Sequence, residues 1–384
     1  MASVVALAQE LVRRPSRGGI DDYGPVLGVL EDWLAARGLA RRHLRDGAGE
    51  LVGLLVQVPG GRPGSWWTLD ACVDTATYGD EQAWSFPPDS GDIVDGWLRG
   101  RGAADSKLAA AMFCHIAADL APRAENLRGG LAVLLDVDEH TGGFGGARAY
   151  LADPQIPRPA GVMIGYPGME EVVVGGRGLW RASIVVHAPS GHSGSSKKVV
   201  GAISRAACLV RLLDAAPLPG AAGAPGFPLP PKLSVTAFHG GQDFSVTPDR
   251  CDLNVDIRTT PTFDGHDAET LVRKAVAELD AELPTPTPTE ITPVATWPPF
   301  RLAEDEQPAA ALLNAAAQAG LAVNPKTAGP SNIGNLLAGH GIPATAGFGV
   351  PYVGLHGIDE RAHLAELPTV YRVYQRAVLN LLQG

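Results

Sequence analysis

Several features of secreted, membrane-spanning or nucleic-acid-binding proteins are scarce or missing in these 384 residues. Only four residues are cysteine and no two form a CxxC pair, so a disulfide framework is disfavoured and a reducing compartment is expected. No uninterrupted apolar run is long enough to cross a bilayer. No run rich in Lys and Arg occurs, and the formal net charge is -10, which disfavours a nucleic-acid partner.

We expect an amphipathic helix rather than a secretion signal at the N-terminus, because the apolar residues recur at helical spacing and Gln9 and Glu10 interrupt them. The most basic short stretch, residues 41–45, is interpreted as a solvated helix end. We therefore expect a cytoplasmic protein without a membrane partner. Hydrophobic residues make up 45% of the chain and charged residues 19%, which indicates a globular protein with a real core.

The first part of the chain alternates strands and helices. Continuous apolar runs at 66–73, 131–137 and 161–165 predict buried strands, and the alanine-rich stretch 103–120 predicts a long helix. Each apolar run ends in polar or glycine-rich residues. This pattern predicts an α/β sheet with its chemistry at the carboxyl ends of the strands.

The middle of the chain has a different order, β-α-β-β-α, which is the ferredoxin-like pattern. Its predicted elements are 179–187, 199–213, 233–238, 251–258 and 268–279, with a surface loop at 216–231 and a return linker at 284–293. Alternation then resumes with a helix at 309–319, a strand near 344–348 and a final helix at 370–382. We expect an α/β domain (1–176 and 294–384) interrupted by a smaller α+β domain (177–293).

Carboxylates and imidazoles gather in four segments, most of them at predicted strand ends: residues 69–75, 95–107, 136–143 and 348–360. A metal site needs such residues from separate segments, because no single local segment can surround an ion.

One of these segments carries a specific motif, Gly-Arg-Gly-Ala-Ala-Asp-Ser-Lys at 100–107. Downstream follow an Asp-Glu-x-x-Gly at 138–142, a Gly-His-Ser at 191–193 and a Gly-x-His-x-x-x-Glu at 354–360. Together they resemble the family of aminoacylases, acetylornithine deacetylase, succinyl-diaminopimelate desuccinylase and related zinc carboxypeptidases, over essentially the whole chain. The resemblance implies a zinc-peptidase-like catalytic α/β domain with an inserted lid domain that usually forms a homodimer.

The resemblance also implies roles for individual residues. Asp105 matches the carboxylate that bridges two zinc ions, and His356 matches the final ligand histidine. Glu139 matches the general base, and Asp74 matches the acid that orients the first ligand. His192 matches the histidine of the inserted domain that reaches the partner subunit's substrate as an oxyanion donor.

Three of the five ligand positions of the family are changed, to Cys72, His140 and Tyr166. Asp105, His140 and His356 still make a complete set of two imidazoles and one carboxylate for a single metal. The resemblance thus implies one zinc ion, or another divalent metal or none, with Cys72 and Tyr166 as possible further ligands.

Simpler interpretations stay open for these residues. His140 would then be a strand-end histidine bonded to a carbonyl, and Cys72 a small apolar filler. Tyr166 would plug the vacated site and bond to Asp105, and His192 would be an exposed loop histidine.

For the substrate, the resemblance points to Arg258 and to the loop containing Ser331 and Asn332, although Arg258 also suits a domain-packing role. We expect a small-molecule substrate with an amide or a carboxylate. The predicted function is a metal-dependent amidohydrolase, a deacylase or small-peptide peptidase, in which Glu139 takes a proton from water.

Two other functions remain. One is a metal-free or non-hydrolytic enzyme of acyl or peptidyl transfer or isomerisation, with Cys72 as nucleophile or Tyr166 as acid/base. The other is a non-catalytic binding module on the same fold. The retained Glu139, Asp105 and His356 count against the binding module, because it has no need of a buried carboxylate cluster.

Overall fold

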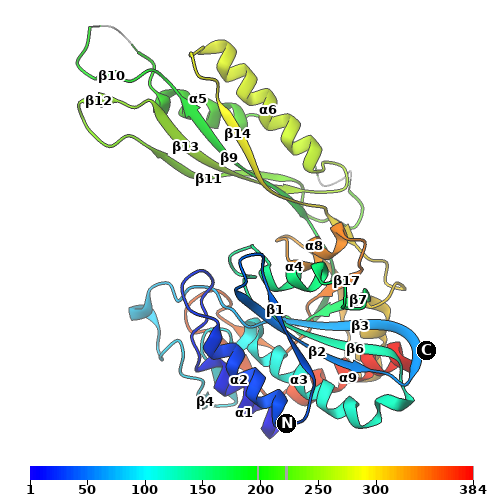
Figure 1. The fold of residues 1–384 in the computed structure, drawn as a ribbon. Coiled ribbons are helices and arrows are strands. Elements are labelled where there is room, and N and C mark those ends of the chain that lie inside the picture. Colours follow the sequence, from blue (N-terminus) through cyan, green and yellow to red (C-terminus); the bar gives the residue numbers. More distant parts are fainter. Residues whose placement is uncertain (197–198, 221–223, 384) are drawn as a thin grey trace. The chain divides into compact units, whose positions relative to one another are not determined.

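The computed structural model describes residues 1–196, 199–220 and 224–383, and the chain divides into two compact units (Figure 1). The first unit consists of Met1–Gly175, Leu302–Lys326 and Asn332–Gly384, and the second of Gly176–Arg301 and Thr327–Ser331. The second unit is thus an insertion in the chain of the first. Within the described residues, no helix has the length and apolar character needed to cross a membrane.

A six-stranded sheet organises the first unit. Its strands run in the order β1 (Arg41–Arg45), β2 (Leu51–Pro59), β6 (Arg128–Asp136), β3 (Arg62–Cys72), β7 (Pro159–Ile164) and β17 (Ala344–Ala346). The strands from β6 to β17 are parallel, and β1 and β2 are antiparallel additions. Because β3, β6 and β7 are parallel, the residues that follow them emerge at one edge of the sheet.

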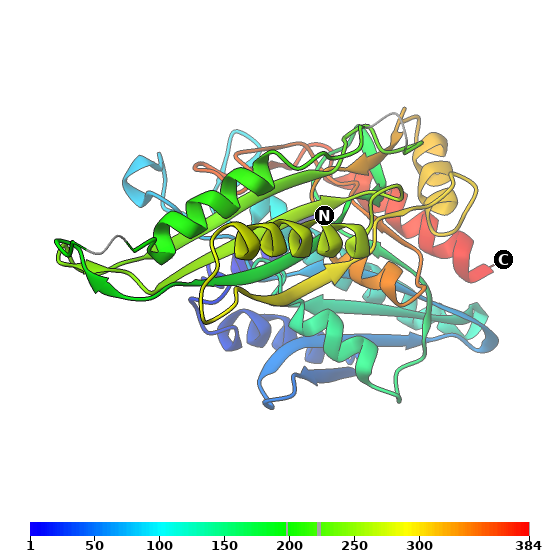
Figure 2. The same ribbon diagram turned by 90° about the horizontal axis from the view of Figure 1, so that it is seen from above.

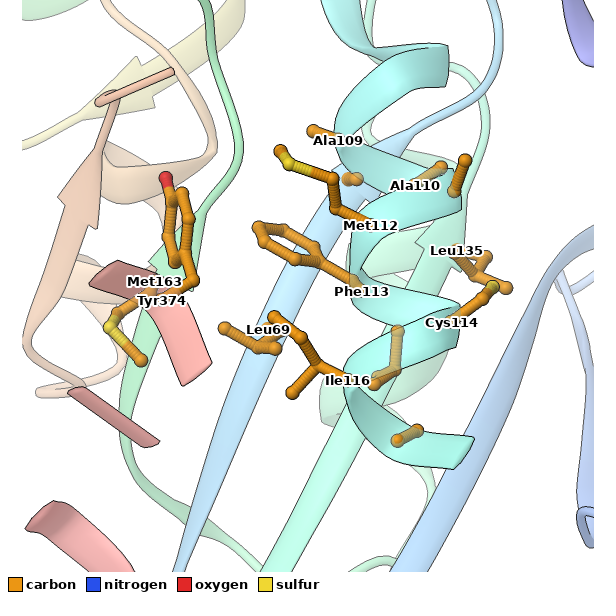
Figure 3. Packing of buried hydrophobic residues seen from close by; sticks show 14 of the residues in the cluster. Leu69, Ala109, Ala110, Met112, Phe113, Cys114, Ile116, Leu135, Met163 and Tyr374 are labelled. Atoms are coloured by element: carbon orange, nitrogen blue, oxygen red, sulfur yellow. The ribbon is translucent and has the colours of Figure 1, made fainter. Parts of the chain in front are cut away.

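Seven α-helices accompany this sheet in the described part of the first unit: α1 (Ala2–Val12), α2 (Gly24–Ala35), α3 (Leu108–Leu120), α4 (Gly145–Ala152), α7 (Ala309–Gln318), α8 (Ile333–Gly339) and α9 (Leu367–Gln383). Helix α3 is the most buried of them, and its side chains fill the space beside Leu69 of β3 and Met163 of β7 (Figure 3). The ring of Phe113 packs edge-on against Tyr374 of α9, with the ring centroids 4.9 Å apart. Each such fully buried side chain contributes about 1.5–3 kcal/mol.

Shorter elements complete the first unit and its connections. They are β4 (Ile93–Val94), β5 (Trp97–Arg99), β8 (Glu171–Gly176), β15 (Phe300–Arg301), β16 (Asn324–Ala328), β18 (Tyr352–Val353), β19 (Arg361–His363) and the short helical turns Glu81–Ala83, Ala103–Lys107 and Ala121–Asn126. Strands β18, β19, β5 and β4 pair in that order, which joins the chain around residue 98 to the chain after residue 351.

The second unit has the chain order β9 (Gly178–His187), α5 (Ala202–Asp214), β11 (Lys232–Gly240), β13 (Arg250–Thr259), α6 (Gly265–Glu282) and β14 (Glu290–Trp297). Its sheet order is β11-β13-β9-β14, and both helices lie on one face (Figure 2). Alternate residues of β9 and β13 are buried against the helices, and those between them form a helix-free polar face. This is the predicted ferredoxin-like pattern. A separate two-stranded pair, β10 (Gly191–His192) with β12 (Val246–Thr247), belongs to the same unit.

Two local predictions were wrong. Residues 41–45 are not a helix end but strand β1, in which Leu44 is buried while Arg41 and Arg42 pair with Glu31 and Asp153. The predicted linker 284–293 becomes strand β14 from Glu290 onward. Pro293 is tolerated there because β14 is an edge strand and its register shifts between Pro293 and Ala295. The predicted loop 216–231 lies partly outside the described residues, at 221–223.

The predicted helix 103–120 was also wrong in its first turn, because α3 begins only at Leu108. Asp105 and Ser106 have non-helical backbone angles, with φ of -121° and -133°. The backbone N–H groups of Gly102, Ala104 and Asp105 bond to the Glu360 carboxylate rather than to helical carbonyls. This detour carries the Asp105 side chain to the edge of the sheet.

Candidate metal centre

Three candidate ligands from distant parts of the chain converge at this edge. Ligand atoms of Asp105, His140 and His356 all lie within 4.8 Å of one another. His356 Nε2 is 2.8 Å from Asp105 Oδ2, and His140 Nε2 is 3.6 Å from the same oxygen. The structure therefore brings together the two imidazoles and one carboxylate that the sequence singled out.

A second group overlaps the first at His140. It consists of Cys72, Asp74 and His140, again with ligand atoms within 4.8 Å. Cys72 Sγ lies 3.9 Å from Asp105 Oδ1 and 3.8 Å from Ser106 Oγ. Burial, and then the charge of Asp105, raise the pKa of the Cys72 thiol well above its ordinary value. The thiol is therefore protonated unless a cation is close by.

Tyr166 follows β7 and stands beside the same carboxylates. Its backbone forms an isolated antiparallel β-bridge with Phe348. Burial and the negative charges of Asp105 and Glu139 raise the pKa of the Tyr166 hydroxyl, so it is a neutral phenol.

The electrostatics of the cluster favour a positive charge. Burial lowers the pKa of His140, but the neighbouring carboxylates of Asp105 and Asp74 outweigh it and raise that pKa to about 11. Burial by itself would raise the pKa of Asp105. The hydrogen bonds and positive charges of His140 and His356 outweigh that effect and bring the pKa well below its ordinary value. Burial raises the pKa of Glu139 to about 7, and its Oε2 lies 3.5 Å from His140 Nδ1.

The residues fit a bound metal ion. Both ring nitrogens of His140 are buried, and neither completes a hydrogen bond, because the nearest carboxylate oxygens lie 3.5–3.6 Å away. A cation held by His140, His356 and Asp105 would satisfy an imidazole nitrogen and the carboxylate together. Two histidines and a carboxylate are a common donor set for zinc or a similar divalent ion.

Asp74 organises the segment that contains the candidate base. Its two carboxylate oxygens accept hydrogen bonds from the backbone nitrogens of Glu139, at 3.2 Å, and His140, at 2.9 Å. Asp74 is fully buried. Its hydrogen bonds therefore hold the turn that presents Glu139 and His140 to the cluster, a relationship that the motif alone did not reveal.

Sequence reasoning missed the part played by Arg101 and Glu360, which form an ion pair with both side chains almost fully buried. Glu360 Oε1 accepts the backbone N–H groups described above, and Arg101 donates to the carbonyl oxygen of Gly357 at 2.7 Å. The pair thereby ties the Asp105 segment to the His356 segment. The one sequence signal for this pair was Glu360, a carboxylate four residues after the candidate ligand His356.

Two further buried carboxylates were also missed. Asp70 in β3 and Asp136 in β6 have no exposed surface, and no N–H group of the described residues donates a hydrogen bond to their oxygens. Burial raises the pKa of Asp70 to about 7 and that of Asp136 well above its ordinary value. They were visible in the sequence as acids inside otherwise apolar runs.

Other predicted site residues lie in the second unit or at its end. His192 is exposed in β10, where its Nδ1 accepts the Gly194 N–H at 3.0 Å. Arg258 donates to Ser331 Oγ at 3.2 Å. Asn332 belongs to the first unit, where its side chain caps helix α8 by accepting the N–H of Gly334.

The site thus has the groups of a metal-assisted amide hydrolase, and similarity to known proteins agrees with this class. The chain matches Peptidase family M20/M25/M40 over residues 73–380, and it belongs to this family. It is 28% identical to a succinyl-diaminopimelate desuccinylase of Cereibacter sphaeroides, over 97% of each chain. It is 29% identical to the enzyme of the same name from Stenotrophomonas maltophilia, over the full length of both.

Solved structures show the same fold. An M20 family metallo-carboxypeptidase from Sulfolobus solfataricus aligns with a TM-score of 0.78 and 16% identity, over 99% of each chain. A dinuclear metal binding peptidase of the M20 family from Bacillus subtilis aligns with a TM-score of 0.73 and 14% identity, over 100% of this chain and 98% of the other. The predicted fold class is confirmed, and the chain is a hydrolase acting on amide bonds.

Proposed function

We propose that this protein is a deacylase or small-peptide peptidase that uses a single metal ion, in contrast to the dinuclear peptidase that shares its fold. The observation that best supports this proposal is that ligand atoms of Asp105, His140 and His356 lie within 4.8 Å of one another, beside Glu139. Zinc suits this donor set best, since imidazole and carboxylate are its ordinary ligands. When bound, such an ion polarises the amide carbonyl and makes water more acidic.

The remaining chemistry belongs to residues of the chain. Glu139 is the proposed general base, because it stands at the cluster and burial brings its pKa to about 7, near the working pH of such a base. It takes a proton from water and returns it to the leaving amine nitrogen. Asp74 keeps Glu139 in place through the backbone.

The single-metal proposal rests on the two remaining ligand positions. Cys72 and Tyr166 stand where the family resemblance implies a histidine and an acid. Tyrosine is not among the ordinary zinc ligands, which are cysteine, histidine and the acids, so the Tyr166 position lacks the donor that an acid would supply. In this proposal Cys72 and Tyr166 fill the second metal position.

Substrate, assembly and location complete the proposal. The curated relatives named above are desuccinylases, which supports a small N-acyl amine with a carboxylate as substrate. Arg258, Ser331 and Asn332 are its proposed contacts. We also propose a cytoplasmic homodimer formed through the inserted unit, in which His192 serves the partner's substrate as an oxyanion donor.

The test is hydrolysis of a panel of N-succinyl, N-acetyl and dipeptide amides by the purified protein, before and after chelation. Turnover that is lost on chelation and restored by about one equivalent of zinc supports the proposal. Turnover that persists without metal and is abolished by thiol alkylation favours a metal-free enzyme using Cys72. Light scattering gives the subunit number, and a monomer contradicts the role given to His192.

A further inference from the structure

We infer that the helix-free face of the β11-β13-β9 sheet carries an anion site for a small dicarboxylate, built from Arg181, Lys232 and Arg258. This site lies wholly within the second unit. The family resemblance points only to Arg258, so Arg181 and Lys232 are new members. The inference is independent of the metal centre.

The strand register places like charges directly opposite each other. Lys232 of β11 is the direct partner of Arg258 in β13. Directly opposed like charges destabilise a sheet. Arg181 of β9 is one register position away, opposite Asp256. Three cations therefore meet on one face of three adjacent strands.

The carboxylates nearby do not balance these cations. Asp256 accepts from Arg181 Nε at 2.6 Å and also from Arg258, whose Nε is 2.8 Å from its other oxygen. One carboxylate thus serves two guanidinium groups. No carboxylate within the described ranges lies within salt-bridge distance of Lys232. A net positive charge remains on this face although the whole chain is acidic.

A further guanidinium increases the crowding of positive charge. Arg177 lines the same pocket, and burial together with the charge of Arg258 lowers its pKa. Its nitrogens donate to the carbonyl oxygens of Gly329, at 2.9 Å, and Pro230, at 2.7 Å, which hold its guanidinium in place. An incoming anion would relieve the repulsion between these groups.

The pocket is large enough for a small molecule. Its volume is about 540 Å³, and Ser234, Thr236 and the backbone at Gly329 and Pro330 complete its walls. Two carboxylates would neutralise two of the three positive charges that Asp256 leaves unbalanced, one reaching Lys232 and Arg258 and the other the terminal nitrogens of Arg181. A lysine on an edge strand also discourages edge pairing, but that role does not account for Arg181.

The experiment measures binding of glutarate to the metal-free protein by calorimetry at fixed ionic strength, with pentanoate as the monocarboxylate of the same length. We expect saturable glutarate binding with a dissociation constant of about 1 mM or lower. Arg181→Gln and Lys232→Gln should each weaken it about tenfold. The matched control is Arg250→Gln, which removes an exposed guanidinium from the same β13 strand and should leave binding unchanged.

The outcomes separate cleanly. No saturable binding, equal binding of pentanoate, or a wild-type affinity for glutarate in the Lys232→Gln and Arg181→Gln variants would overturn the inference. Thermal unfolding gives a second readout, because Lys232→Gln should raise the melting temperature of the ligand-free protein while reducing its stabilisation by glutarate. Turnover identifies the source of the carboxylates. A raised KM with unchanged kcat in Lys232→Gln assigns them to the amide substrate, and unchanged kinetics to a separate dicarboxylate effector.

Discussion

The backbone nitrogen of Asp105 donates a hydrogen bond of 3.3 Å to Glu360, a residue only four positions after His356. Two candidate ligands that are 251 residues apart in sequence are thereby fixed against each other by one buried carboxylate. Arg101 neutralises that carboxylate from the Asp105 side. This link thereby supports the geometry of the candidate metal centre.

Replacing Glu360 with Gln should therefore cost both stability and metal affinity. The change leaves the buried Arg101 without its counter-charge, which typically costs about 3–5 kcal/mol. Urea unfolding of the metal-free protein measures the loss, and zinc titration of the folded variant measures affinity. The paired variant Arg101→Met with Glu360→Gln should lose less than the sum of the two single changes. A loss below about 1 kcal/mol with unchanged zinc affinity would refute the link.

Glu139→Gln tests the proposed base. We expect the variant to fold and to bind metal normally while kcat falls by about 10²–10⁴, because proton transfer loses its acceptor. Steady-state kinetics on an active amide substrate and metal analysis give the two readouts. Asp138→Asn is the matched control, since Asp138 bonds to Thr141 and Gly145 within the loop and not to the cluster. Full activity in Glu139→Gln would exclude the base.

Cys72 provides a test against the metal-free alternative. Its side chain is only 6% exposed and its raised pKa keeps the sulfur protonated, so iodoacetamide should react slowly with the native protein. We expect Cys72→Ala to keep most activity and its metal. Mass spectrometry locates the alkylated residues over time. Rapid modification of Cys72 with parallel inactivation would favour a thiol nucleophile.

His115 of α3 should make stability depend on pH. Burial lowers its pKa below the ordinary value of 6.5, while its ring contacts Ser3 Oγ and the Ala111 carbonyl. The folded state then binds fewer protons than the unfolded state. Its stabilising contribution is present above about pH 6.5 and is lost as pH falls through the folded pKa.

Denaturant unfolding at pH 7.5 and pH 5.5 measures this effect. The wild type should lose more free energy of unfolding than His115→Gln over the interval. The exposed His266 of α6 provides the control substitution, and its loss should match the wild type. Equal losses in wild type and His115→Gln would show that His115 does not contribute.

Much of the fold could be predicted because its central strands are continuous apolar runs, which β3 and β6 display plainly. Strand β1 was not predicted because its arginines suggested a solvent-exposed segment. Leu44 is buried when β1 pairs with β2. Strand β14 escaped because prolines precede it and one lies inside it. In both strands tertiary pairing overrides local composition.

The candidate site was more predictable than the contacts that support it. Residues at the ends of parallel strands must meet at one edge, so the segments that follow β3 and β6 were expected at the same edge of the sheet. Arg101 and Glu360 are 259 residues apart, and no local pattern announces an ion pair between them. Likewise, the proximity of Asp136 in β6 to Asp70 and Cys72 in β3 follows only from the sheet register, in which Asp136 is the direct partner of Cys72.

The most direct test of the account is the metal content of the purified, metal-replete protein, determined by elemental analysis beside His140→Ala and Cys72→Ala. We predict about one equivalent of zinc or a similar divalent ion in the wild type and in Cys72→Ala, and none in His140→Ala. Two equivalents in the wild type, with one lost in Cys72→Ala, would contradict the single-metal centre. No metal in the wild type would contradict metal-dependent hydrolysis altogether.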